Sequence, residues 1–180
     1  MNCLKIINLH KQYGLNRLYL QSFLTGLLSF VFLYVPISIR HGMPDLDEFG
    51  IFPLLIAILF MPFIHVFMHM LPLIMMNKQA RLIYKQNTIF FSNINYYTKK
   101  YVSKKASLLA AVAPTLLITI PGVMAAYFFS GYYVYFLIFT SIHIGMTFTD
   151  FLYILYISKA PKEAYIENSN NEIAILVKSS

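Results

Sequence analysis

The chain has 180 residues, of which 58% are apolar and only 12% are charged, and its mean hydropathy is +0.63. This balance excludes an ordinary soluble domain and indicates an integral membrane protein with room for one domain. The single cysteine, Cys3, excludes a disulfide framework and a cysteine-type zinc site. The net charge of +7 does not indicate binding to nucleic acid, because the basic residues lie between apolar runs, as topology determinants do.

Four apolar runs follow a short basic beginning. Residues 1–17 carry three basic residues and no acid, which predicts a cytoplasmic N-terminal arm. Runs long enough to cross a bilayer follow, and we expect them to be the four helices of one membrane domain, 18–157. Their approximate bounds are 18–39, 51–76, 107–129 and 132–157. The remaining residues, 158–180, are polar and predict a poorly ordered cytoplasmic tail.

The polar segment between the second and third runs, residues 77–106, has a different composition. It holds seven of the fourteen Lys and Arg residues and no acid. Between Leu82 and Tyr97 most residues are β-branched or aromatic, which predicts a short β-hairpin at the membrane surface. Ser103 is placed to cap the third helix. The expected fold class is therefore an all-α integral membrane protein with a short β-hairpin-like cytoplasmic segment.

The distribution of basic residues predicts the orientation of the chain. With both termini in the cytoplasm, thirteen of the fourteen Lys and Arg residues lie inside, and only Arg40 lies outside. This asymmetry is typical of multi-pass membrane proteins. The abundance of Lys, Ile, Asn, Phe and Tyr indicates a bacterial genome of low GC content. We therefore expect a bacterial cell-membrane protein whose first partner is the lipid bilayer.

Two histidines, His65 and His69, stand four residues apart in the second run, which contains no charged residue. Residues at this spacing share one face of a helix and can present two imidazoles to one metal ion. Asp150 is the only acid within the four runs. Counted from the outer ends of their runs, the two histidines are about the fifteenth and nineteenth residues and Asp150 is about the nineteenth. The three groups should therefore lie at similar depth, in the cytoplasmic half of the membrane.

Two imidazoles and one carboxylate form a catalytic type of zinc site, with a fourth position open to water. Ligands of this kind need supporting hydrogen bonds, and the fourth run offers His143, Thr147 and Tyr153 near Asp150. A structural interpretation remains open, in which the three groups hydrogen-bond across helices and hold the bundle together. A copper site is a further alternative, because three methionines lie near these residues, although methionine also fills gaps in apolar packing. These are Met61, Met68 and Met146.

The order of these features resembles a family of small bacterial membrane proteins described as putative zincin peptidases. The resemblance covers most of the chain: a histidine pair on the second helix, a β-like cytoplasmic segment, a Ser-Lys-Lys entry to a Pro-containing third helix, and an Asp on the fourth. That family in turn looks like the site-2 intramembrane metalloproteases, which use H-E-x-x-H on one helix and an Asp on a later one. The resemblance implies that His65, His69 and Asp150 are zinc ligands.

The motif departs from that pattern at Val66, where the zincin glutamate should stand. That glutamate accepts and passes on the proton of the attacking water, and general acid–base help of this kind is typically worth about 10²–10⁴-fold. Valine cannot transfer a proton, so the sequence predicts no catalytic residue and a weak or inactive peptidase, that is, a pseudoenzyme. Such a protein could still hold zinc or clamp a peptide or a transmembrane helix.

Two alternatives of other classes stay open at this point. One is an active intramembrane zinc metalloprotease that uses an unusual base, either Asp150 or a group supplied by the substrate. The other is a non-catalytic membrane adaptor, in which the basic segment 77–106 contacts anionic lipid or a partner.

Overall fold

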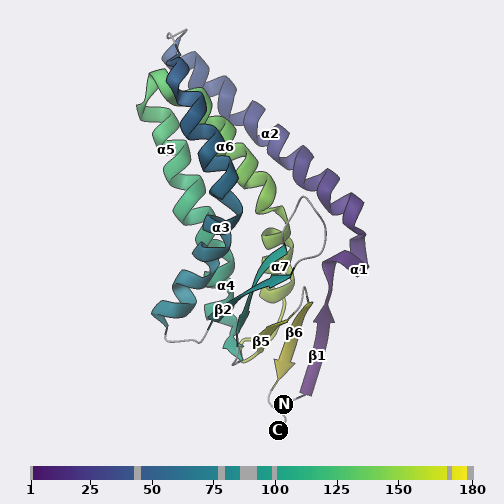
Figure 1. The fold of residues 1–180 in the computed structure, drawn as a ribbon. Helices are drawn as coiled ribbons and strands as arrows, with labels where there is room; N and C mark the ends of the chain where they lie inside the picture. Colours follow the sequence, from purple (N-terminus) through teal and green to yellow (C-terminus); the bar gives the residue numbers. More distant parts are fainter. Residues whose placement is uncertain are drawn as a thin grey trace.

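The computed structural model describes residues 2–42, 46–76, 80–85, 93–98, 101–169 and 172–177 (Figure 1). Its helices are α1 (Leu9–Tyr13), α2 (Leu15–His41), α3 (Ile51–Met75), α4 (Lys104–Pro114), α5 (Ile120–Phe128), α6 (Tyr133–Met146) and α7 (Phe148–Ser158). Between α4 and α5 lies a π-helical segment, η2 (Thr115–Thr119), and short 3-10 turns are η1 (Glu48–Gly50) and η3 (Ser130–Tyr132). The strands are β1 (Asn2–Ile7), β2 (Ala80–Lys85), β3 (Asn93–Thr98), β4 (Val102–Ser103), β5 (Tyr165–Ser169) and β6 (Glu172–Val177).

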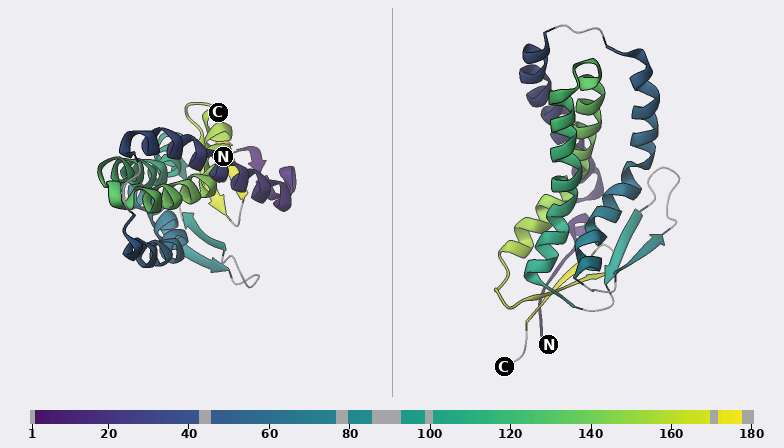
Figure 2. Two further views of the ribbon diagram at one scale, coloured as in Figure 1. Left: turned by 90° about the horizontal axis from the view of Figure 1, so that it is seen from above. Right: turned by 90° about the vertical axis from the view of Figure 1, so that its left-hand side faces the viewer.

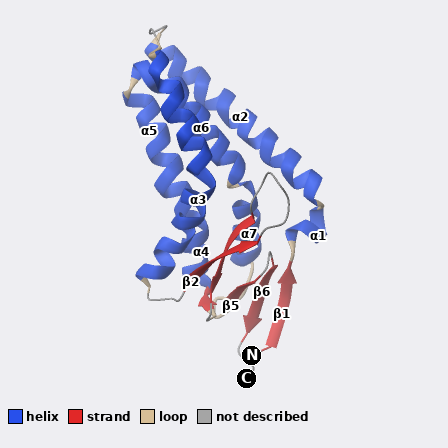
Figure 3. Cartoon of the chain, in the orientation of Figure 1, coloured by secondary structure: helices blue, strands red, loops and turns tan. Residues whose placement is uncertain are grey.

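The long helices form a bundle, and all the described strands gather at one end of it (Figures 1 and 3). The first and last described strands, β1 and β6, lie at this same end. Seen from the side in Figure 2, α3 runs down to the hairpin of β2 and β3, while α7 ends beside the other strands. The molecule therefore has a helical bundle and, at one end of it, a region that contains strands β1 to β6, which we call the sheet end.

Three described helical stretches are long and apolar enough to cross a membrane. They are Leu15–His41, Glu48–Met75 and Lys104–Phe128. A fourth span results if Ser130–Met146 and Phe148–Ser158 are counted together, although these two helices are bent by 43°. The sequence predicts one helix at 132–157, and the structure instead divides this stretch between α6 and α7. Asp150 lies in the first turn of α7, just after the break.

The fold is mostly helical, as predicted, but it contains more strand than the predicted hairpin. The second sheet is antiparallel, with the strand order β1-β6-β5-β4. Strand β1 falls in the N-terminal arm, and β5 and β6 fall in the tail, so the prediction of a poorly ordered tail is wrong. The physical reason is the alternation of apolar residues on the strands, since Ile166, Ile173 and Ile175 are all buried against the helices.

The hairpin predicted between Leu82 and Tyr97 is present, since β2 and β3 pair in antiparallel register from Ala80 with Thr98 to Lys85 with Asn93. The residues that connect the two strands lie outside the described part of the chain. Ser103 stands at the N-cap position of α4, as predicted, but its side chain makes no capping hydrogen bond.

A buried apolar cluster joins the sheet to the beginning of α2 and the end of α7. Its members are Ile7, Leu9, Leu18, Ile157, Ala160, Ala164, Ile166, Ile173 and Ile175. The end of α7 is also held by Lys104, whose Nζ donates to the carbonyls of Ser158 at 2.7 Å and Ala160 at 2.6 Å. A lysine at a helix C-terminus satisfies carbonyls that have no partner within the helix. The sheet end therefore fixes one end of the helix that carries Asp150.

The crossing of α2 and α6 depends on two glycines, Gly26 and Gly145. A Cβ atom on Gly145 would lie 2.8 Å from the backbone oxygen of Ser22 and 3.3 Å from the Cα of Gly26. Only a residue without a side chain permits this approach of the two backbones. The contact holds the end of α6 against α2, two residues before the break that precedes α7.

Candidate metal centre

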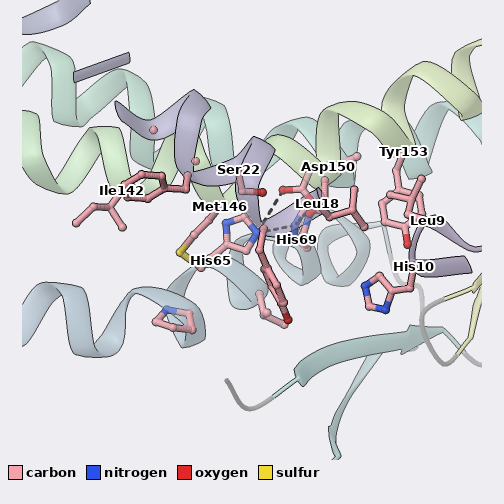
Figure 4. Close-up of a pocket in the computed structure, with 18 of the residues that line it drawn as sticks. Leu9, His10, Leu18, Ser22, His65, His69, Ile142, Met146, Asp150 and Tyr153 are labelled. Carbon is pink, nitrogen blue, oxygen red and sulfur yellow. Dashed lines mark hydrogen bonds and ion pairs between the residues drawn. The ribbon is translucent and has the colours of Figure 1, made fainter. Parts of the chain in front are cut away.

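His65, His69 and Asp150 converge in the interior, as Figure 4 shows. The two imidazoles project from one face of α3, and the carboxylate approaches them from the first turn of α7. The histidines are 8% and 6% exposed, and the side chain of Asp150 is 13% exposed. Each residue offers one ligand atom, and these three atoms lie within 4.8 Å of one another. The structure thus brings together the three residues that the sequence indicates as ligands.

The spacing of the ligand atoms fits a tetrahedral zinc ion. The Nε2 atoms of His65 and His69 are 3.2 Å apart. Asp150 places Oδ2 at 3.3 Å from the Nε2 of His65 and Oδ1 at 3.4 Å from the Nε2 of His69. Two atoms that each lie about 2.0–2.2 Å from one tetrahedral zinc are separated by roughly 3.3–3.6 Å. The donor set and its spacing are therefore compatible with a bound metal ion.

The other ring nitrogen of His69 fixes its tautomer. Nδ1 lies 2.8 Å from the backbone oxygen of Ala110 on α4, deep in the structure. A carbonyl oxygen can only accept, so Nδ1 carries the proton and donates. In the neutral ring, Nε2 is then left with a lone pair, and this atom faces Asp150 and His65. Such a ring cannot donate to the carboxylate, but it is prepared to bind a cation.

His65 is supported by a third histidine. Its Nδ1 lies 3.2 Å from the Nε2 of His143, and the Nδ1 of His143 lies 2.9 Å from the Oγ1 of Thr119. His143 is fully buried on α6, while Thr119 ends the π-helical segment η2. If the Nε2 of His65 binds a metal, its proton must be on Nδ1. The hydrogen bonds then run from His65 to His143 and from His143 to Thr119.

Asp150 has a buried atom in need of a partner. Its Oδ2 is shielded from solvent and accepts no hydrogen bond from any group in the described part of the chain. A buried carboxylate oxygen without a partner is costly, and a bound cation satisfies it.

The three predicted supporting residues have different surroundings. His143 contacts a candidate ligand directly, as described above. The hydroxyl of Thr147 donates to the carbonyl of Ile144, 2.9 Å away at the end of α6. This hydroxyl proton is therefore directed to the backbone of α6 and not to a candidate ligand. Tyr153, one turn beyond Asp150, lines the cavity beside the ligands (Figure 4).

The ligands form part of the wall of a cavity of about 840 Å³. Helices α2, α3, α6 and α7 supply most of its lining, and the sheet end contributes residues such as Ile166 and Ile173. Val66 also lines this cavity and is 9% exposed. The position that a zincin gives to its glutamate therefore faces the same space as the ligands. Among the described lining residues, Asp150 is the only acid.

Two groups of the site are missing from the sequence predictions, namely the carbonyl of Ala110 and the hydroxyl of Thr119. The sequence contains a signal for the first, because Pro114 follows Ala110 by four residues and has no N–H to occupy that carbonyl. The position of Thr119 depends on a π-helical turn, which the helical period of the sequence does not reveal.

The sequence model of a family described as "putative zincin peptidase" matches residues 58–165, an interval that contains both histidines of α3, His143 and Asp150. No curated protein and no solved structure matches the chain.

Proposed function

This chain belongs to the family described as putative zincin peptidase, and on that premise we propose that it is a membrane protein whose His65, His69 and Asp150 bind one zinc ion. The observation that carries the proposal is the convergence of one ligand atom from each of the three residues within 4.8 Å, with the two Nε2 atoms 3.2 Å apart and each of them 3.3–3.4 Å from a different oxygen of Asp150. These separations suit zinc, and the tautomer of His69 directs a lone pair to the same point.

The chain is proposed to cross the bacterial cell membrane with both termini in the cytoplasm. Large apolar side chains on the outside of the helices support insertion, for example Phe32 at 70% and Ile39 at 78% exposure. The excess of Lys and Arg on one side supports the orientation. Under this orientation the sheet end lies at the cytoplasmic face, and the metal centre lies in the cytoplasmic half of the bilayer.

A zinc ion in such a site polarises a carbonyl group and lowers the pKa of water. The protein's own residues determine how much of this chemistry can be used. His69 and His65 are oriented by Ala110 and His143, and both face the cavity of about 840 Å³. Val66, by contrast, presents two methyl groups where a proton acceptor is required. We therefore propose that peptide hydrolysis by this chain is weak or absent, and that the zinc site is kept in a pseudoenzyme.

The competing structural interpretation makes a different demand on His69. With Nδ1 donating to Ala110, His69 can donate to Asp150 only as an imidazolium with a second proton on Nε2. The two interpretations therefore differ in what lies between the imidazoles and Asp150, either a metal ion or a proton on the Nε2 atom of His65 or His69.

Metal analysis of the detergent-purified protein separates the two. We expect one zinc ion per chain by mass spectrometry of the elements, and its loss in His65→Ala and Asp150→Asn. His41→Ala is the matched control, since His41 lies at the other end of the bundle and bonds to Ala126. Wild-type protein without stoichiometric metal would contradict the proposal, and stoichiometric copper would replace zinc in it.

Hydrolysis is tested by restoring the glutamate. With fluorescently labelled casein as the probe, the wild type should release fragments at the background rate, and Val66→Glu should exceed it by about 10²-fold or more. The gain should disappear when His69→Ala is added. Zinc-dependent cleavage by the wild type, lost in Asp150→Asn, would instead establish an active peptidase with an unusual base.

A further inference from the structure

The helical stretch from α4 to α5 supplies no metal ligand, yet it contacts the supporting groups of both histidines. The carbonyl of Ala110 accepts from the Nδ1 of His69, and the hydroxyl of Thr119 pairs with His143, which in turn pairs with His65. Each contact is made where this stretch departs from a regular α-helix. Those departures have identifiable causes in the sequence.

The first departure is at Pro114. In an α-helix the carbonyl of residue 110 accepts from the N–H of residue 114, but proline has none. The next N–H along the chain, that of Thr115, bonds to Val112 instead. The carbonyl of Ala110 is therefore free of backbone donors from both residues and is available at 2.8 Å to His69.

The second departure is the π-helical segment that follows. The N–H of Ile120 donates to the carbonyl of Thr115, five residues back, which defines a π turn. Pro121 adjoins this turn and also lacks an N–H. In a regular α-helix Thr119 would follow Ala110 by about 2.5 turns and would project from the opposite side. The π turn contains one extra residue, which reduces the offset between Ala110 and Thr119 to about 2.2 turns. Thr119 can therefore project toward the same side of the bundle as the contact of Ala110 with His69.

We infer that Pro114 and Thr119 are positioning residues that set the tautomers of the two histidine ligands. Pro114 acts by leaving the carbonyl of Ala110 free to hold the Nδ1 proton of His69. Thr119 acts through His143: its oxygen accepts from the Nδ1–H of His143, which leaves the Nε2 of His143 to accept the Nδ1 proton of His65. Both rings then direct the lone pair of Nε2 to the same point as Asp150. The inference rests on the proposed zinc site and deepens it, since it says which residues far from the metal prepare its ligands.

The test measures zinc affinity in detergent by competition with a chromophoric chelator. Supporting hydrogen bonds of metal-bound histidines are typically worth about 10–100-fold in affinity, so Thr119→Val should weaken binding by roughly 10-fold or more. Thr119→Ser keeps the hydroxyl and should remain within about 3-fold of the wild type. Thr140→Val is the matched control, because Thr140 is a buried threonine whose hydroxyl has no hydrogen-bond partner among the described residues.

Pro114→Ala restores an N–H that competes with His69 for Ala110, and it should also weaken zinc binding by about 10-fold. Pro36→Ala is its control, since Pro36 lies within α2 and is exposed on the outside of the bundle. Circular dichroism and size-exclusion chromatography establish that each variant is folded. If Thr119→Val is misfolded, Thr119→Ala replaces it.

A second readout reports the tautomers directly. The chain has five histidines, so ¹⁵N-histidine labelling gives a spectrum simple enough to assign by single substitutions. In the zinc-loaded wild type, the rings of His65 and His69 should carry the proton on Nδ1. Thr119→Val should disturb only the His65–His143 pair, and Pro114→Ala only His69.

The outcomes distinguish this inference from the proposed function. A wild type that binds zinc, together with Thr119→Val and Pro114→Ala that both bind within about 2-fold and keep the same tautomers, would overturn the inference and leave the zinc site standing. A wild type that binds no zinc would overturn both.

Discussion

The metal centre and the sheet end contain polar networks of similar geometry in different surroundings. At the metal centre, contacts of 2.8–3.4 Å join buried side chains, as between His69 and Ala110 or Asp150. At the sheet end, Glu172 accepts from Asn8 at 2.9 Å and from Lys11 at 3.1 Å. The side chains of Lys11 and Glu172 are 78% and 38% exposed. Distances alone would give the two networks equal weight, whereas burial makes an unpaired group costly only at the metal centre.

The largest expected effect is the stabilisation of the buried centre by zinc. A ligand that binds only the folded state adds about 4 kcal/mol to the free energy of unfolding at 1,000 times its Kd. We expect added zinc to raise the unfolding temperature of the wild type in detergent and to leave that of His69→Ala unchanged. If zinc raised the unfolding temperature of both proteins equally, it would bind at another place. The buried network would then not differ from the exposed one in binding zinc.

A second buried contact, the crossing of α2 and α6, tests packing rather than charge. Gly145→Ala places a methyl group 2.8 Å from the backbone oxygen of Ser22, so the helices must separate. Overpacking of this kind costs about 1–3 kcal/mol. The expected result is a lower unfolding temperature, together with weaker zinc binding because α6 leads into the helix of Asp150. Gly131→Ala is the control, because its added Cβ meets no atom within 4 Å in the described part of the chain, its two neighbours in sequence aside.

The sequence could predict the three candidate ligands but not every contact that supports them. The pair His65 and His69 follows from a local spacing, and the depth of Asp150 follows from counting along one apolar run. The family match covers residues 58–165, an interval that contains all three residues. The contacts with Ala110 and Thr119 were not predicted, because they depend on a missing N–H and a π turn in a helix that supplies no ligand.

The sheet end was mispredicted for another reason. Strand β1 pairs with β6, as in Asn2 with Val177, so the two halves of this pairing lie at opposite ends of the chain. Strands β1, β5 and β6 are only six, five and six residues long, so each gives a weak signal without its partner. The order of the tail arises only when its isoleucines meet Ile7 and Leu18 in one buried cluster. Long-range pairing of this kind is not visible in any local window of sequence.

A smaller effect is expected where the sheet end holds α7. Lys104→Met keeps the apolar stem but removes the donor to the carbonyls of Ser158 and Ala160. A cation at a helix C-terminus typically contributes about 0.3–1 kcal/mol, so the free energy of unfolding should fall by that amount. Lys105→Met, which removes the same charge from an exposed neighbour, should have less effect. Equal losses in the two variants would attribute the effect to net charge and not to the cap of α7.

The smallest effect belongs to the exposed network around Glu172. Hydrogen bonds from Asn8 and Lys11, together with the charge of Lys11, hold the pKa of Glu172 below its usual value. Because the pKa is lower in the folded chain, the carboxylate stabilises the fold at neutral pH, and this contribution is lost as the pH falls from about 4.3 through the folded value. Glu172→Gln should therefore lower the unfolding temperature slightly at pH 7 and match the wild type at pH 3. If Glu172→Gln lowered the unfolding temperature at pH 7 as much as substitution of a buried ligand does, then exposure would not explain the difference between the two networks.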